Sequence, residues 1–358
     1  MANSSPTMHG HHGPSKKTIV FIILFLVIAA AGLTYVKWWP YYHKAIKAIG
    51  EHTIGSSILY GGADTAPDPS WDAAWSYAVT YYKAVWKAAI LGILLGSLVQ
   101  VLIPSGWLLR VLGKTNFRST AIAGAAAIPG MMCSCCAAPI AVGLRKKNVS
   151  AGAALAFWLG NPMINPATLI FMAFVLSWEF TLLRLVFGLI LTFGVSYWAN
   201  RIAGEQTFTE SEVLQPMDAG EADSQPLFIR WMKSLGTMLL HVVPAYFIAV
   251  LLLGAARAWL FPTLDDTALN SILMLILFAI AGTLFVIPTA AEIPIAQAFM
   301  SYGFGASIAS VLIVTLPAVS LPSLLMIRRS FPARVVWFVF GSVIALGILS
   351  GIIGAVLL

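Results

Sequence analysis

The feature that most constrains this chain is a series of apolar runs, each long enough to cross a lipid bilayer as a helix. Spanning the hydrocarbon core takes about 20 apolar residues in helical form. Of the 358 residues, 59% are hydrophobic and 10% are charged, whereas an average soluble domain carries about 25% charged residues. This composition excludes a soluble enzyme, a secreted disulfide scaffold and a disordered protein, and it predicts an all-α integral membrane protein.

The apolar runs divide the chain into regions. They are Thr18–Val36, Ala84–Pro104, Ser119–Leu144, Ser150–Leu176, Phe180–Asn200, Leu235–Leu260, Ser271–Met300, Ser307–Ile327 and Val335–Leu357. We predict a cytoplasmic tail (1–17), a membrane anchor (18–36), an extracytoplasmic aromatic interfacial segment (37–83), permease repeat 1 (84–200), an acidic cytoplasmic linker (201–234) and permease repeat 2 (235–358). The interfacial assignment rests on the preference of Trp and Tyr for the headgroup level.

The two halves of the chain show the same residues in the same order. At an offset of 155, Pro139-Ile140-Ala141 matches Pro294-Ile295-Ala296, and Pro162 matches Pro317. Internal repeats are a common construction in transporters.

Basic clusters then constrain the topology. Arg110–Arg118 and Arg145–Lys147 should both be cytoplasmic, which requires the segment between them to enter the membrane and return, with its break at Pro129-Gly130. This predicts about seven transmembrane helices plus two re-entrant hairpins in two inverted repeats, with the N-terminus cytoplasmic. The alternative is eight or nine plain transmembrane helices.

All three cysteines of the chain fall within four residues, as Cys133, Cys135 and Cys136. Thiolates are soft ligands for thiophilic metals and metalloids. The preceding Pro-Gly pair predicts that the cysteines begin a half-helix, whose N-terminus favours the thiolate. We therefore predict that these thiols bind a soft metal or metalloid cargo; the alternative is three small packing residues.

Glu292 is the only acidic residue inside an apolar run. The repeat offset places it opposite Ala137, next to the cysteines of the other half. A carboxyl group at membrane depth is by default a functional hypothesis, often a proton carrier. We predict that Glu292 contributes to cargo binding and proton coupling, with Thr289 beside it in the cargo site; the alternative is a neutral structural Glu.

Two Asn-Pro pairs, Asn161-Pro162 and Asn165-Pro166, interrupt another apolar run, and the matching segment of the second half contains Ser320. Proline breaks helices and frees carbonyl groups, and transporters bind cargo at broken helices. Asn161, Asn165 and Ser320 are therefore predicted cargo-binding residues. A proline kink without cargo is the alternative.

These motifs resemble the bacterial permease family typified by the organoarsenical efflux permease ArsP. The resemblance covers roughly Ala84 to Leu357 and is carried by Cys133-Ser134-Cys135, Pro139, Ala153–Phe157, Asn161-Pro-x-x-Asn165-Pro166, Glu292-x-Pro294 and Leu316–Leu325. It implies a multi-span inner-membrane permease that exports trivalent organoarsenicals with the participation of cysteines. The chain differs from the family pattern in the extra thiol Cys136, in Met131-Met132 and in a His-bearing N-terminus.

The remaining polar residues suggest smaller roles. His9, His11 and His12 could bind a divalent metal, a disordered tail being the alternative; Gln100 and Arg184 are expected to form hydrogen bonds between helices. No catalytic set, phosphate loop or cofactor motif is present. The expected partners are a small-molecule or metalloid solute and the lipid bilayer, not nucleic acid, and a homodimer is left open.

The sequence thus predicts a permease that exports a soft, thiol-reactive solute, coupled to protons, in a bacterial inner membrane. The alternatives are a permease for a metal cation or other small solute, and a membrane thiol oxidoreductase. The oxidoreductase would need a second redox pair, and the chain has no cysteine outside the cluster.

Overall fold

The computed structural model describes residues 16–59, 67–204, 226–261 and 272–358, and all regular structure in these ranges is helical. Seven helices there are long and apolar enough to cross a membrane, which confirms the predicted all-α fold and its number of spans. They are Ile19–Glu51, Trp71–Leu102, Ala151–Val175, Trp178–Ala203, Leu227–Leu260, Ala306–Ile327 and Ala333–Leu357. His9, His11, His12 and most of the acidic linker lie outside the described residues.

The first two spanning helices are longer than the apolar runs that predicted them. Helix α1 (Lys16–Leu33), the π-helical turn η1 (Thr34–Trp38) and α2 (Trp39–Glu51) form one continuous helix. Helix α3 (Trp71–Leu102) begins well before Ala84 because the Ser70 side chain caps its first turn, accepting from the Ala73 amide at 3.0 Å. Much of the expected interfacial segment therefore extends the spanning helices.

Short helices follow α3: α4 (Ser105–Leu112), α5 (Phe117–Ala127), the 3₁₀ turn η2 (Ile128–Gly130) and α6 (Ser134–Lys146). The start of α5 and the residues after α6 both contact the end of α4. At the start of α5 the Ser119 hydroxyl donates to the Val111 carbonyl (3.1 Å), and after α6 the Ser150 amide donates to the Leu112 carbonyl (3.0 Å). The chain therefore turns back within residues 117–146; that it does so inside a membrane remains a prediction.

Broken and long helices complete the first half. Helices α7 (Ala151–Met163) and α8 (Pro166–Val175) are separated by a short break, and α9 (Trp178–Leu189), the π-turn η3 (Ile190–Val195) and α10 (Ser196–Ala203) form one span.

The second half has the same order of elements. It consists of α12 (Leu227–Leu260), α13 (Ile272–Leu284), α14 (Glu292–Ser301), α15 (Ala306–Ala318), α16 (Leu321–Ile327) and α17 (Ala333–Leu357). A long helix, short helices, a broken helix and a long helix thus occur in this order in both halves, with α4 as an additional short helix in the first half. Their inverted orientation in a membrane stays a prediction.

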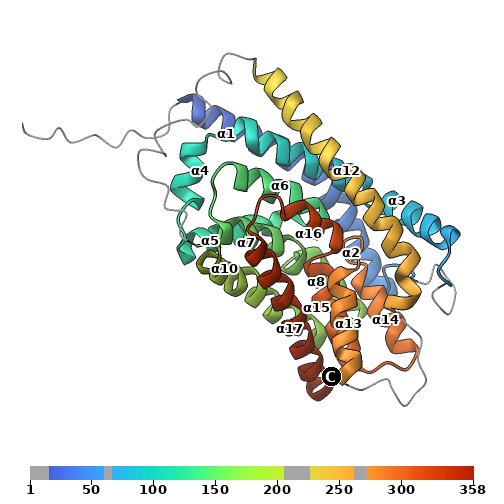
Figure 1. Ribbon diagram of the computed structural model, residues 1–358. Coiled ribbons are helices and arrows are strands. Elements are labelled where there is room, and N and C mark those ends of the chain that lie inside the picture. The colour runs from blue at the N-terminus through green and yellow to red at the C-terminus, as the bar shows by residue number, and fades with distance from the viewer. Residues whose placement is uncertain (1–15, 60–66, 205–225, 262–271) are drawn as a thin grey trace, which may run out of the picture.

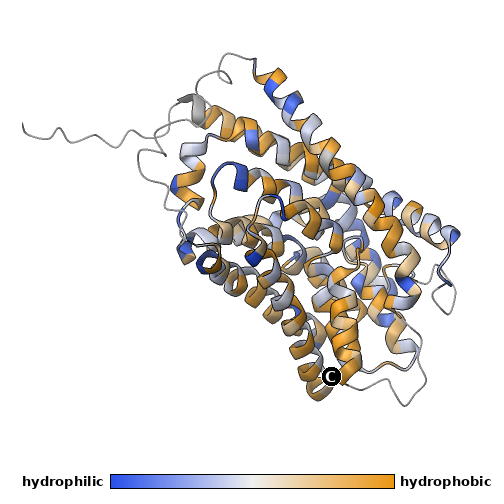
Figure 2. Ribbon diagram, viewed as in Figure 1, coloured by the Kyte–Doolittle hydropathy of each residue, from blue (hydrophilic) through white to orange (hydrophobic). Residues whose placement is uncertain are grey.

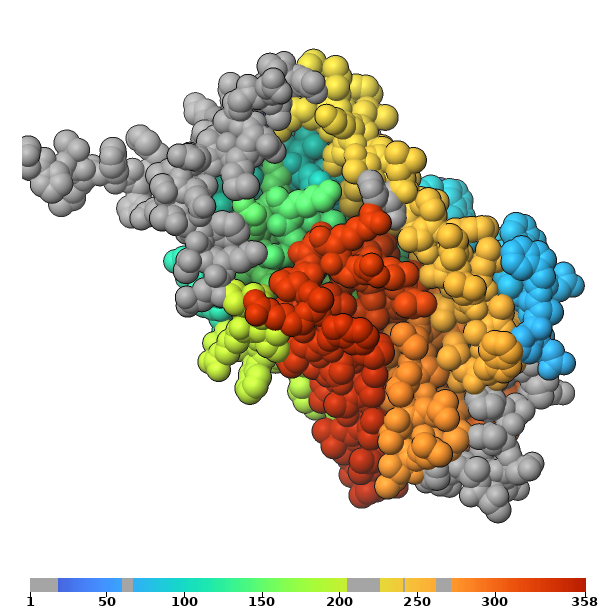
Figure 3. Space-filling view, in the orientation of Figure 1, coloured from blue at the N-terminus to red at the C-terminus, as the bar shows by residue number. Residues whose placement is uncertain are grey.

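Helices α7 and α15 form the centre of the molecule, and almost all of their side chains are buried. Helix α3 packs along α12 and α6, while α17 packs against α15 and α13 (Figure 1). The outer helices expose large apolar side chains, such as Leu26 on α1 and Val356 on α17. Apolar colour accordingly dominates the long helices in Figure 2, and the C-terminal part of the chain, which includes α17, occupies the centre of the face shown in Figure 3. Such a surface fits a lipid environment.

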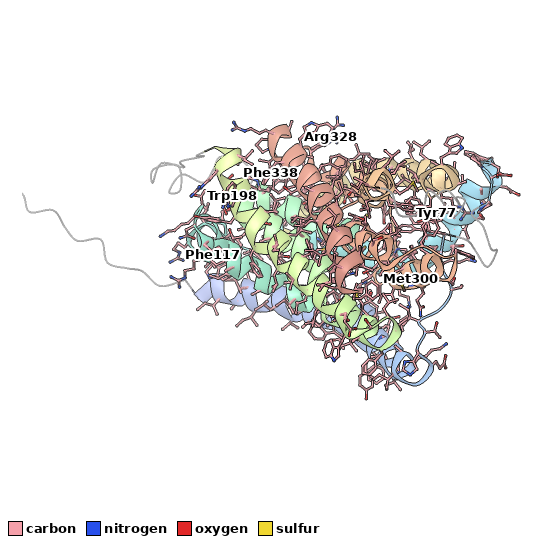
Figure 4. The ribbon with its side chains drawn as sticks, turned by 90° about the horizontal axis from the view of Figure 1, so that it is seen from below. Tyr77, Phe117, Trp198, Met300, Arg328 and Phe338 are labelled. Carbon is pink, nitrogen blue, oxygen red and sulfur yellow. The ribbon has the colours of Figure 1, made fainter. Side chains whose placement is uncertain are left out.

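Basic residues from distant parts of the chain gather at one end. Arg145 Nε donates to the Ser330 carbonyl (3.3 Å), and Arg334 Nη2 donates to the Ala203 carbonyl (2.6 Å). Phe117, at the start of α5, marks this end in Figure 4, whereas Tyr77, near the start of α3, lies at the opposite end of the molecule. That this end faces the cytoplasm remains a prediction of the positive-inside rule.

Candidate functional site

The cysteines lie where the chain leaves one short helix and begins the next. Helix α5 ends at Ala127, the turn Ile128–Gly130 follows, and Met131 adopts a left-handed conformation with φ of 48°. Cys133 is the N-cap residue of α6, so Cys135 and Cys136 fall in the first turn of that helix. The thiols therefore lie at a helix N-terminus, as predicted, where unpaired amide groups favour negative charge.

All three thiols are buried, but only two of them contact each other. Cys133 Sγ lies 2.8 Å from Cys136 Sγ, whereas Cys135 Sγ contacts the Ser320 hydroxyl at 3.0 Å. In the described part of the chain no three His, Cys, Asp or Glu side chains converge as metal ligands. The geometry thus offers a two-thiol site and a separate third thiol, rather than the expected set of three.

Ser320 brings the second half of the chain to this cluster. It precedes α16, and its hydroxyl lies 3.4 Å from the Ser134 hydroxyl and 3.1 Å from that of Ser323. A capping box between Ser320 and Ser323 stabilises this turn. The predicted site residue Ser320 therefore touches the cysteine segment directly.

Lys37, which sequence reasoning did not assign to the site, also reaches it. Its side chain is 5% exposed, donates to the Tyr41 hydroxyl (2.9 Å) and to Thr289 Oγ1 (3.1 Å), and interacts electrostatically with Cys133 and Cys136. The Thr289 side chain also lies close enough to interact electrostatically with the Cys133 thiol. Thr289 thus links the lysine to the paired thiols.

The next residue, Trp38, joins the same helix to the first half. Its indole Nε1 donates to the Pro129 carbonyl (2.8 Å) in the break before α6. Lys37 and Trp38 both lie in the π-helical turn η1. Such π-helical turns often occur at functional sites. One irregular turn therefore contacts the broken segments of both halves. A lysine just after an apolar run resembles an ordinary flanking charge, so the sequence contained no signal that distinguished it.

Glu292 has a buried cationic partner, whereas the sequence led us to expect an isolated carboxyl group. Its Oε1 accepts from Arg184 Nη1 at 2.6 Å, and both side chains are buried. No hydrogen-bond partner of Oε2 is present among the described residues. Arg184 was expected to form hydrogen bonds between helices, and it does so as the partner of this carboxylate.

Proline explains why Arg184 finds further acceptors. A proline at position i has no N–H to donate to the carbonyl at i−4, so Pro166 leaves the Pro162 carbonyl free and Pro317 leaves that of Ile313 free. Arg184 donates to both, at 2.7 Å and 3.1 Å. The helix breaks of the two halves thus supply the acceptors that hold a buried cation.

The helix that carries the two Asn-Pro pairs is broken, as predicted, and the break lies at the second pair. Helix α7 continues through Asn161 and Pro162 to Met163, and α8 begins at Pro166. Asn161 Oδ1 accepts from the Met132 amide (3.4 Å) and so supports the cysteine segment. Asn165 instead caps α8, accepting from the amides of Ala167 and Thr168.

Comparison with known proteins places the chain in a family. Residues 125–356 match the family ArsP_1, described as predicted permease. The chain is 50% identical over 328 residues to UPF0718 protein YraQ of Escherichia coli, covering 92% of this chain and 93% of YraQ. It is 23% identical over 297 residues to UPF0718 protein MJ0584 of Methanocaldococcus jannaschii, covering 65% and 81% of the two chains. No solved structure matches. The chain belongs to the ArsP_1 family of predicted permeases.

Proposed function

We propose that this permease exports a soft, thiol-reactive solute, such as a trivalent organoarsenical, and that the paired thiols of Cys133 and Cys136 bind it. The close approach of the two sulfur atoms, buried where both halves of the chain meet, carries the proposal. A trivalent arsenic atom with one organic substituent has two positions left for thiolates, and this pair supplies two. The match favours a mono-organic arsenical over a metal ion that needs three or four protein ligands.

We also propose that the permease lies in a bacterial inner membrane with its N-terminus in the cytoplasm, and that Glu292 couples transport to protons. The ion pair with Arg184 changes the physical argument, because a proton must now compete with a guanidinium for the carboxylate. Protonation would remove the charge attraction within the pair and weaken the contact between α14 and α9, so proton uptake and helix movement would be linked. This is a sharper form of the prediction made for an isolated carboxyl.

Uptake into everted inner-membrane vesicles tests the proposal. Vesicles that contain the wild-type chain should accumulate trivalent phenylarsenical when a proton gradient is applied, and a protonophore should abolish the accumulation. Vesicles with Cys133→Ser serve as the matched control and should show at most background uptake. Equal accumulation of Zn²⁺ or Cu⁺ in place of the arsenical would favour a metal-cation permease instead.

A thiol oxidoreductase is the second candidate, and the 2.8 Å separation of Cys133 Sγ and Cys136 Sγ is the observation that favours it. Intact mass under reducing and oxidising conditions would detect a reversible loss of two hydrogens. If the protein still transports cargo while Cys133 and Cys136 are kept reduced throughout the assay, disulfide chemistry is not needed for transport.

A further inference from the structure

A cavity of about 730 Å³ is lined in part by Thr289, which accepts from Lys37 near the thiol site. Its wall comes from α2, the segment 54–58 that follows it, α3, α12 and the segment that precedes α14, and it includes Thr80, Ser57, Pro288, Thr289, Lys44 and Arg257. Tyr77, also in the wall, lies at the end of the molecule remote from Phe117 (Figure 4). The cavity is therefore at the end opposite the basic cluster of Arg145 and Arg334.

The charged side chains among the described residues of this wall are all positive. Lys44 and Arg257 line the cavity, and no Asp or Glu is among its described lining residues. The Arg257 side chain is 4% exposed, and its guanidinium lies 5.6 Å above the centre of the Tyr77 ring. Its Nε has no hydrogen-bond partner within the described ranges. A buried cation without an acidic partner is costly, so a negatively charged ligand in the cavity would relieve that cost.

Thr289 connects the cavity to the thiols. It forms part of the wall, accepts from Lys37 Nζ at 3.1 Å and interacts electrostatically with the Cys133 thiol. Lys37, which donates to the hydroxyls of Tyr41 and Thr289, adds a third positive charge behind the wall. Positive charge therefore extends from the cavity to the paired sulfur atoms.

We propose that this cavity is an anion-binding vestibule in which Arg257 and Lys44 hold a small anionic solute after it leaves the thiols. The ligand class is a thiophilic solute that carries a carboxylate, a sulfonate or an oxyanion group. Metal cations are disfavoured by the same charges. Only the preceding step at Cys133 rests on the proposed function; anion binding in the cavity does not.

Thiol-modification rates test the vestibule without any transport assay. The reporter is Thr80→Cys, on the cavity wall, in full-length chain with Cys133, Cys135 and Cys136 replaced by Ser. Its reaction with the anionic sulfonatoethyl methanethiosulfonate is compared with that of the cationic trimethylammonioethyl reagent, each relative to free 2-mercaptoethanol. Because fixed charge near a cleft changes encounter rates by about 10-fold or more, the anionic reagent should be favoured at least about tenfold.

Substitutions then identify the residues that cause the preference for the anionic reagent. Arg257→Gln should lower the preference at least about threefold, Arg257→Lys should retain it, and Lys44→Gln should lower it further. Lys114→Gln, at the opposite end, is the control and should leave it unchanged. Thiosulfate should also slow the anionic reagent more than chloride at equal ionic strength, and this difference should disappear in Arg257→Gln.

A preference equal to that of free thiol would overturn the proposal, as would one that Arg257→Gln and Lys44→Gln leave unchanged, or thiosulfate acting no better than chloride. If the cysteine-free chain does not fold, the same rates can be read at Thr80→Cys with the native cysteines present, using mass spectrometry of the labelled peptide. If Arg257→Gln does not fold, the exposed Lys44 still provides the charge-removing variant. None of these readouts depends on arsenical transport, so a failure here is distinct from a failure of the proposed function.

Discussion

Arg184 and Glu292 form a buried ion pair, with 2.6 Å between Nη1 and Oε1, although 108 positions separate them in the sequence. The pair joins α9 of the first half to α14 of the second. Carbonyl groups of Pro162 and Ile313 complete the surroundings of the guanidinium. The interaction is therefore a direct connection between the two halves at the centre of the molecule.

Removing one partner of this pair should destabilise the protein asymmetrically. Arg184→Met leaves a buried carboxylate without its cation, a change that costs about 3–5 kcal/mol. Glu292→Gln should cost less, because the amide oxygen can still accept from Arg184 and both carbonyls remain. Thermal unfolding in detergent, followed by tryptophan fluorescence, would measure both. The double variant Arg184→Met with Glu292→Met should recover part of the loss; an unchanged midpoint in Arg184→Met would contradict the account.

The same carboxylate should be required for proton coupling. Glu292→Gln keeps the contact with Arg184 but removes the group that titrates. In proteoliposomes, we expect it to retain counterflow, which needs no proton cycle, and to lose gradient-driven flux by at least about 10-fold, the size typical of a missing proton-transfer group. Wild-type gradient-driven flux in this variant would show that the driving force enters elsewhere.

The fold predicts that both ends of residues 117–146 are on the same side of the membrane. The Ser150 amide donates to the Leu112 carbonyl, and Lys147 is near the start of α12, where burial and the charge of Arg230 lower the pKa of Lys147 from its usual value. Single cysteines replacing the exposed Lys114 and Lys146 in a cysteine-free chain should react with an impermeant maleimide from one side only, the cytoplasmic side. Labelling from opposite sides would mean that the segment crosses the membrane once.

Close approach of α3 to the cysteine helix should make Gly92 intolerant of substitution. A Cβ at Gly92 would lie 2.2 Å from the Cys136 carbonyl oxygen, whereas a Cβ at Gly236 meets nothing within 4 Å. Gly92→Ala should therefore lower stability by about 1–3 kcal/mol through overpacking. Gly236→Ala is the control and should be neutral or stabilise by up to about 1 kcal/mol. Equal unfolding midpoints for the two variants would refute the close contact.

Run length and hydropathy predicted nine apolar runs, because crossing a bilayer imposes a minimum length on each run, and the positions of the basic clusters reduced the predicted spanning helices to seven. The Pro129-Gly130 break was also predictable, since local chemistry determines it. Residues Lys37–Glu51 were harder, because aromatic side chains suit both an interface and a helix that continues past it. The sequence assigned them to the interface, and the structure continues the helix through them.

The site was predictable as far as single residues go. The sequence assigned both Cys135 and Ser320 to the cargo site, and their side chains contact each other at 3.0 Å. The pairings were not predictable: nothing local links Lys37 to Thr289 or Arg184 to Glu292, since each pair depends on how distant helices pack. The separation of Cys135 from the other two thiols depends on helix geometry, in which only positions i and i+3 or i+4 share a face.

The central claim is that Cys133 and Cys136 together bind the cargo, and counterflow of trivalent phenylarsenical in proteoliposomes tests it most directly. The three single serine variants and the triple variant are compared at equal protein, with intact mass reporting bound arsenical. The account predicts that Cys133→Ser, Cys136→Ser and the triple variant lose both counterflow and retained arsenical, whereas Cys135→Ser keeps both within about threefold, the scale of one lost peripheral hydrogen bond. Wild-type counterflow by the triple variant, or equal loss in all three single variants, would contradict it.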